Sequence, residues 1–186
     1  MNITCKLIDK LFSRINKTET NYKFCDVDTV RNLTVIHYGR KHFWPILFDP
    51  ISNINFNKPY GGLWTSPIDS NYGWIDWNKD YKWVFCDPSS VSFKLKFTDD
   101  AKILVIDGEE DLNGLPTYLP TYKFTPKLFK TKEYLDFRAL SKVCDALWLT
   151  EKGLRETKSS HPISFEGWDC ETVLIMNKKC CYQLKY

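Results

Sequence analysis

The apolar residues of this chain fall in short runs separated by turn residues, and each run has the length of a β-strand. The clearest run is 91–97, where Val91, Phe93, Leu95 and Phe97 alternate with polar residues, as in a strand with one buried face. The run AKILVID is more continuously apolar and predicts a more fully buried strand. Further strands are expected at LTVIHY (33–38), GGLW (61–64), ALWL (146–149), TVLIM (172–176) and CCYQLKY (180–186), the last at a sheet edge.

Helical spacing is found in three segments. Apolar residues recur every three or four positions across 3–15, which predicts an amphipathic N-terminal helix within residues 1–20. A second helix is expected at 131–144. The segment SNYGWIDW at 70–77 predicts a third helix, with Ser70 as its candidate N-cap.

Turn residues predict two long loops, at 43–60 and at 108–126, because each of these segments carries three prolines. No internal repeat is visible. Many short strands and a few helices indicate an α+β fold with a mostly antiparallel sheet. We expect one domain over residues 1–186.

The composition excludes several classes of protein. Aromatic residues make up 16% of the chain, which argues against disorder. The net charge of +3 argues against a protein held to nucleic acid mainly by charge. The longest apolar runs are too short to span a membrane, and the first residues show no secretory signal.

Seven cysteines without a CxxC pair predict reduced thiols rather than a disulfide framework. We therefore expect a cytoplasmic protein, or one in the host cytoplasm if the source is viral. The three histidines, His37, His42 and His161, do not have metal-ligand spacing with a cysteine pair, so no metal site is expected.

Three segments could carry chemistry. VIHYGR places His37 near the end of a strand, KPYGGLWTSP (58–67) combines a glycine pair with hydroxyl groups, and FEGWDCETVLI (165–175) places Glu171 at the start of an apolar strand. Taken singly, each also has a structural interpretation: a buried histidine, a tight turn, and a solvent-facing carboxylate.

Taken together, IHYGR, GLWTSP and CETVLI resemble the ADP-ribosyltransferase superfamily of the His–Tyr–Glu type. The resemblance is greatest to small, uncharacterised phage proteins of this fold, through GGLWTSP, YGWIDW, KILVID, CDALWLT and GWDCETVLI, and spans about residues 33–177. It implies a split antiparallel sheet that encloses a cleft for NAD. The family places its histidine on the first core strand, its second motif on the next strand, and its glutamate near the front of a late strand.

The resemblance implies two catalytic residues. Glu171 would hold the 2′-hydroxyl of the nicotinamide ribose and stabilise the oxocarbenium-like transition state. His37 would bind the ribose on the adenosine side or orient the diphosphate. Asp169 departs from the family pattern, because the arginine-modifying branch usually has Glu or Gln two residues before the catalytic glutamate.

The remaining cofactor-binding residues are also implied by the resemblance. Gly62 would pair with the nicotinamide amide, Ser66 would support the ribose or Glu171, and Arg40 would meet the diphosphate. An aromatic side chain would stack on nicotinamide. The candidates for this stacking are Trp64, Tyr72 and Trp74, and Tyr38 is expected among the other cofactor-binding residues.

The expected activity is transfer of ADP-ribose from NAD to a macromolecule of the host, with release of nicotinamide. A host protein is the favoured acceptor, and nucleic acid is an alternative. Two other functions stay open: an NAD glycohydrolase on the same fold, and a non-catalytic phage-type inhibitor that binds a host protein.

Overall fold

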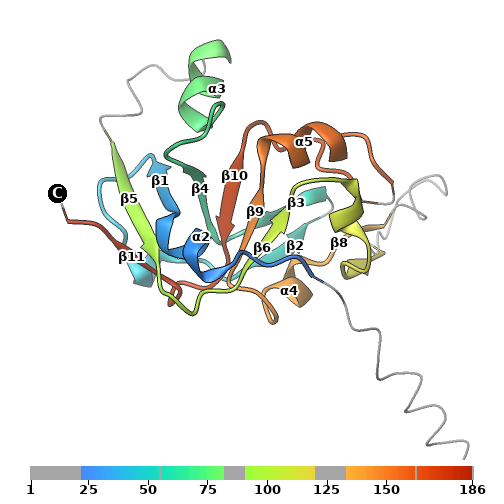
Figure 1. The fold of residues 1–186 in the computed structure, drawn as a ribbon, viewed down its shortest axis with the longest axis horizontal. Helices are drawn as coiled ribbons and strands as arrows, with labels where there is room; N and C mark the ends of the chain where they lie inside the picture. Colours follow the sequence, from blue (N-terminus) through green and yellow to red (C-terminus); the bar gives the residue numbers. More distant parts are fainter. Residues whose placement is uncertain (1–21, 55, 82–90, 120–132, 162, 186) are drawn as a thin grey trace, which may run out of the picture.

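Strands from all parts of the described chain form one seven-stranded sheet, in the order β11-β5-β1-β4-β10-β9-β6 (Figure 1). The computed structural model describes residues 22–54, 56–81, 91–119, 133–161 and 163–185, so the expected N-terminal helix lies outside the described residues. The strands are β1 (Thr34–Tyr38), β4 (Leu63–Pro67), β5 (Ser92–Phe97), β6 (Ile103–Ile106), β9 (Ala146–Leu149), β10 (Thr172–Ile175) and β11 (Cys181–Gln183).

Neighbouring strands of this sheet are antiparallel, except that β6 and β9 are parallel. The sheet is therefore mixed, and the protein has a single-domain α+β fold, as the sequence predicts at this coarse level. The expected edge position of the last strand is confirmed, since β11 pairs with β5 and ends the sheet order.

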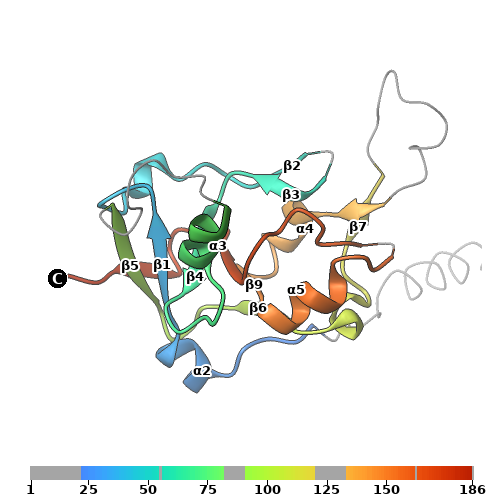
Figure 2. The same ribbon diagram turned by 90° about the horizontal axis from the view of Figure 1, so that it is seen from above.

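Helices and small ladders cover the sheet. Figure 2 shows α2 on one side of the molecule and the β2–β3 pair on the other. The helices are α2 (Val27–Asn32), α3 (Trp74–Tyr81), α4 (Phe137–Leu140) and α5 (Glu151–Thr157), with 3₁₀ turns η1 (Pro45–Leu47) and η3 (Glu109–Leu112). The small ladders pair β2 (Ser52–Ile54) with β3 (Phe56–Tyr60) and β7 (Thr117–Tyr118) with β8 (Tyr134–Leu135).

Apolar side chains fill both faces of the sheet, because successive residues of a strand point to opposite sides. In β10, Leu174 packs in one buried cluster, whereas Val173 and Ile175 pack in another. The continuous apolar runs of β6, β9 and β10 reflect this two-sided burial. The alternating run of β5 buries Phe93, Leu95 and Phe97 on one face only.

The expected long loops are wrong in part. Residues 43–60 contain η1, β2 and β3 instead of an irregular loop. Asn57 of β3 is buried although it is polar, because its side chain donates to Ser164 O and accepts from the Leu135 amide. The described part of 108–126 also contains η3 and β7.

Of two predicted helices, one is shorter than expected and the other begins later in the chain. Within 131–144 the structure describes only β8 and the four-residue α4, because Asp136 starts the helix by accepting from the Ala139 amide. The helix predicted at 70–77 begins at Trp74. Ser70 is not its cap: the hydroxyl of Ser66 accepts from the Trp74 amide.

Candidate functional site

The three segments that resemble the superfamily lie on neighbouring strands. β1 carries His37, β4 carries Trp64 and Ser66, and β10 follows Glu171 directly. β4 lies between the other two and pairs with both, with Ile36 opposite Ser66 and Val173 opposite Thr65. Segments more than 100 residues apart are thus brought within one strand spacing of each other.

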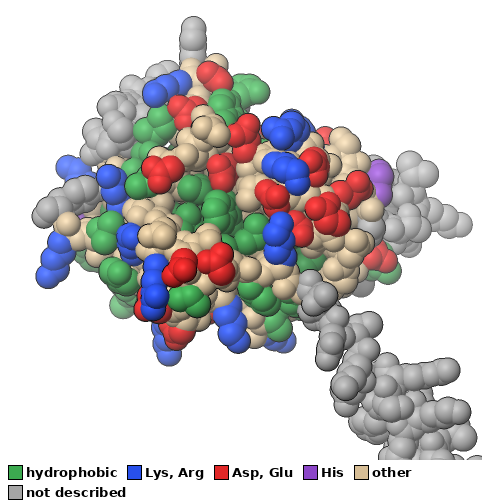
Figure 3. All heavy atoms as spheres, viewed as in Figure 1, with side chains coloured by type: hydrophobic (Ala, Val, Ile, Leu, Met, Phe, Trp, Pro, Cys, Tyr) green, Lys and Arg blue, Asp and Glu red, His purple; other side chains and the backbone are tan. Residues whose placement is uncertain are grey.

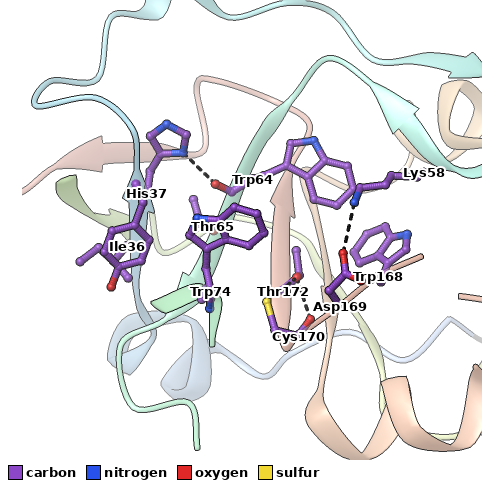
Figure 4. A pocket seen from close by; sticks show the side chains of 12 residues that line it. Ile36, His37, Lys58, Trp64, Thr65, Trp74, Trp168, Asp169, Cys170 and Thr172 are labelled. Atoms are coloured by element: carbon purple, nitrogen blue, oxygen red, sulfur yellow. Dashed lines mark hydrogen bonds and ion pairs between the residues drawn. The ribbon is translucent and has the colours of Figure 1, made fainter. Parts of the chain in front are cut away.

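A pocket of about 240 Å³ opens where these strands meet. Its walls carry three indole rings, those of Trp64, Trp74 and Trp168 (Figure 4), and we call it the indole pocket. It is lined by Ile36, His37, Tyr38, Lys58, Trp64, Thr65, Ser66, Trp74, Trp168, Asp169, Cys170 and Thr172. The predicted residues His37, Tyr38, Trp64, Ser66 and Trp74 therefore share one cavity.

His37 is fixed across the strand pair by a hydrogen bond of 2.8 Å between its Nδ1 and the carbonyl oxygen of Trp64. A carbonyl oxygen only accepts, so Nδ1 carries the hydrogen and Nε2 is left as an acceptor. Burial lowers the pKa of His37 below its usual value, which keeps the imidazole neutral. The ring can accept a hydrogen bond from a ligand hydroxyl but does not supply a positive charge.

Two of the three candidate stacking residues line the pocket. Trp64 packs on Trp168 with ring centroids 4.8 Å apart, and Trp74 stacks on Trp77 at 4.9 Å. Trp74 is 37% exposed, so part of its ring is available to a ligand. Tyr72 has another role: its hydroxyl donates to Asp80, and this bond raises its pKa to about 12.

The glycine pair, Gly61 and Gly62, has a role in backbone conformation. Gly61 and Gly62 have φ values of +83° and +69°, and a Cβ on Gly61 would meet the carbonyl oxygen of Pro50 at 2.2 Å. The amide of Gly62 already donates to the carbonyl oxygen of Asp49. The pair therefore makes the turn into β4, and this amide has a partner within the protein.

Glu171 is 8% exposed and lies between two residues that line the indole pocket, Cys170 and Thr172. Glu171 itself is not part of that lining. One carboxylate oxygen accepts from Trp148 Nε1 at 2.8 Å and the other from the Ser70 hydroxyl at 2.7 Å. Ser70 in turn lines a hollow of about 290 Å³ next to the indole pocket.

Arg40 lies on the other side of His37. It lines a hollow of about 130 Å³ that shares His37 and Trp64 with the indole pocket, and Gly62 is also part of that wall. The positively charged candidate therefore lies in a neighbouring hollow and is not part of the indole pocket lining.

Sequence reasoning missed several residues of this region. Trp148 lies on the short apolar strand at 146–149, and its indole N–H is the donor that holds Glu171. Burial raises the pKa of the Cys170 thiol to about 11, which makes it a poor nucleophile. The periodicity of the sequence carries no signal for these roles, because each depends on a contact between distant segments. The other missed residues are Lys58, Ser70, Trp168 and Thr172.

The described residues include no group of three or more His, Cys, Asp or Glu side chains arranged to hold a metal ion. In the same part of the chain, no helix is long and apolar enough to cross a membrane. Figure 3 shows acidic and basic side chains on the same face, with hydrophobic side chains exposed between them.

The chain matches no protein-family model, no curated protein and no solved structure. Its function is therefore inferred from the site geometry and from the motif segments.

Proposed function

We propose that the protein is an NAD-dependent ADP-ribosyltransferase with an ADP-ribosyltransferase-like sheet. It transfers ADP-ribose to a host macromolecule, with a protein as the favoured acceptor, and releases nicotinamide. The observation that carries this proposal is the adjacency of β1, β4 and β10, each next to one of the three motif segments.

The indole pocket suits the nicotinamide half of the substrate. Ligand cavities usually measure about 300–1,000 Å³, so a pocket of about 240 Å³ holds a ring and its sugar rather than a whole dinucleotide. Trp64 and Trp74 offer flat apolar surfaces to the ring. Nε2 of His37 accepts from a ribose hydroxyl, and Arg40, in the neighbouring hollow, is the candidate for the distant part of the dinucleotide.

The reaction breaks the bond between the nicotinamide nitrogen and C1′ of the ribose, and positive charge develops on the sugar. Glu171 carries the charge that stabilises this transition state. In the proposal, the ribose reaches the adjoining hollow that Ser70 lines, where its 2′-hydroxyl replaces the Ser70 hydroxyl on one carboxylate oxygen, while Trp148 keeps the other. C1′ then forms a bond with a nucleophile of the acceptor, which loses a proton.

The test uses NAD labelled in its adenylate phosphate, incubated with the protein and a cell lysate. We expect label on protein, and loss of most of that label in Glu171→Gln, whose side chain keeps the size and the acceptor oxygen for Trp148. The matched control is Glu166→Gln, an exposed glutamate five residues away, which should label as well as the parent protein.

Other outcomes identify the alternatives. Label on nucleic acid changes the acceptor class, and free ADP-ribose without a labelled macromolecule indicates a glycohydrolase. If NAD is neither consumed nor bound, the proposal fails, and the aromatic surface is better explained as a binding site for a host protein.

A further inference from the structure

Lys58 closes one end of the indole pocket. Its Nζ lies 5.5 Å from the centroid of the Trp64 ring and donates to the carbonyl oxygen of Gly167 at 3.0 Å. It also forms an ion pair of 3.7 Å with Asp169 (Figure 4). Among the residues that line this pocket in the described chain, Lys58 is the only one with a cationic side chain, since His37 is neutral.

The ion pair is exchangeable. The side chains of Lys58 and Asp169 are 47% and 36% exposed, and their 3.7 Å separation is longer than a charge-assisted hydrogen bond. Exposed pairs of this kind contribute little to stability, because water competes for both charges. A ligand anion that reaches Lys58 with shorter contacts can therefore displace Asp169.

The other residues that line the pocket indicate which chemical group the anion is attached to. Three indole rings form an apolar space for a planar ring, and Lys58 lies at its rim. The indole faces also attract a positively charged ring, such as the pyridinium of nicotinamide, while Lys58 at the rim attracts a negative group. The combination favours an aromatic ring that carries a negative group.

We propose that the indole pocket binds the aromatic mononucleotide half of its ligand, and that Lys58 leaves Asp169 to bind the phosphate. This inference rests on the proposed function, because NAD supplies the nicotinamide mononucleotide. It assigns the phosphate of the mononucleotide half to Lys58, which lines the pocket, and not to Arg40, which does not. Asp169 acts as an internal competitor that occupies Lys58 until the phosphate arrives.

The experiment compares two ligands that differ only by the phosphate, nicotinamide mononucleotide and nicotinamide riboside, by calorimetric titration. The parent protein should bind the mononucleotide more tightly. Lys58→Gln should weaken mononucleotide binding about tenfold and should not weaken binding of the riboside, which has no phosphate. Lys142→Gln, the same charge change at an exposed residue outside the pocket lining, should alter neither constant.

A second variant should change mononucleotide binding in the opposite direction. Asp169→Asn removes the competitor but keeps the shape of the side chain, so mononucleotide binding should become about two- to fivefold tighter. Circular dichroism should show that both variants are folded. A substitution that only damaged the fold would weaken binding of both ligands and would not strengthen either.

The inference is overturned if the mononucleotide has no advantage over the riboside, if the advantage survives Lys58→Gln, or if Arg40→Gln removes it instead. It is also overturned if Asp169→Asn weakens mononucleotide binding. Failure of the proposed function is a separate result: the protein would consume no NAD while the preference for the phosphate, and its dependence on Lys58, persisted.

Discussion

Asp169 and Glu171 are two carboxylates on one short segment, and their surroundings differ completely. Asp169 lies at the rim of the indole pocket and forms an ion pair with Lys58 at 3.7 Å. Glu171 is buried and accepts two short hydrogen bonds, from Trp148 and Ser70. The rim thus holds a loosely paired charge, and the interior holds a carboxylate with a donor on each oxygen.

This difference separates two roles for polar groups beside a cavity. A buried carboxylate with short, well-directed donors is held in one position, and removing it leaves those donors without partners. A half-exposed charge with one long contact contributes little to the fold and is available to a ligand. The structure therefore predicts that substitutions at Glu171 change stability, whereas substitutions at the rim change binding.

The largest expected effect comes from Glu171→Leu. It removes both acceptor oxygens and leaves Trp148 Nε1 and the Ser70 hydroxyl without a partner, so the free energy of unfolding should fall by about 2–4 kcal/mol. Asp169→Leu should change it by less than about 0.5 kcal/mol. Urea unfolding, with m-values that stay the same, measures both changes.

Glu171→Gln is the matched control for that experiment. Its amide keeps an acceptor for Trp148 and offers Ser70 a donor, so we expect a loss of about 1 kcal/mol at most. Equal losses for leucine at positions 169 and 171 would show that the two carboxylates do not differ as described.

The sequence predicts the parts of this molecule where one face of a strand is buried. The alternation of Phe93, Leu95 and Phe97 identifies β5 because it records burial on one side. The β2–β3 pair escapes detection because Asn57 and Pro59 are typical of loops, and the partners of Asn57 lie 78 and 107 residues away in the chain.

The candidate site, like the fold, could be predicted from the sequence only in part. The order of the motif segments predicts that His37, Trp64 and Trp74 belong together, and the structure places them in one pocket. The contact between Lys58 and the backbone of Gly167 joins residues 109 positions apart and leaves no trace in local spacing. Physical contacts of this range are set by the three-dimensional fold, which residue periodicity does not record.

A smaller effect is expected from Trp74→Ala, which sharpens the description of the pocket. Trp74 is 37% exposed and stacks on Trp77, so its loss should change stability little. Nicotinamide mononucleotide should bind about two- to tenfold more weakly, because an aromatic stack contributes about 0.5–1.5 kcal/mol. Tyr182→Ala, at a 50% exposed tyrosine of β11, should leave this binding constant unchanged. Equal weakening by both variants would remove the special role of the pocket indole.

His37 combines features of both regions, since it lines the pocket like Asp169 and is fixed by a short hydrogen bond like Glu171. Burial lowers its pKa below the usual 6.5, so the unfolded chain takes up this proton at a higher pH than the folded protein does. The stabilisation is complete above about pH 6.5 and is lost as the pH falls below that value. Urea titrations between about pH 7.5 and pH 5 should therefore show a decline in the free energy of unfolding that is smaller in His37→Gln, whose amide can still donate to the Trp64 carbonyl. An identical decline in both proteins would mean that His37 is as easily protonated in the folded state as in the unfolded one, and the neutral acceptor that the site requires would be absent at mildly acidic pH.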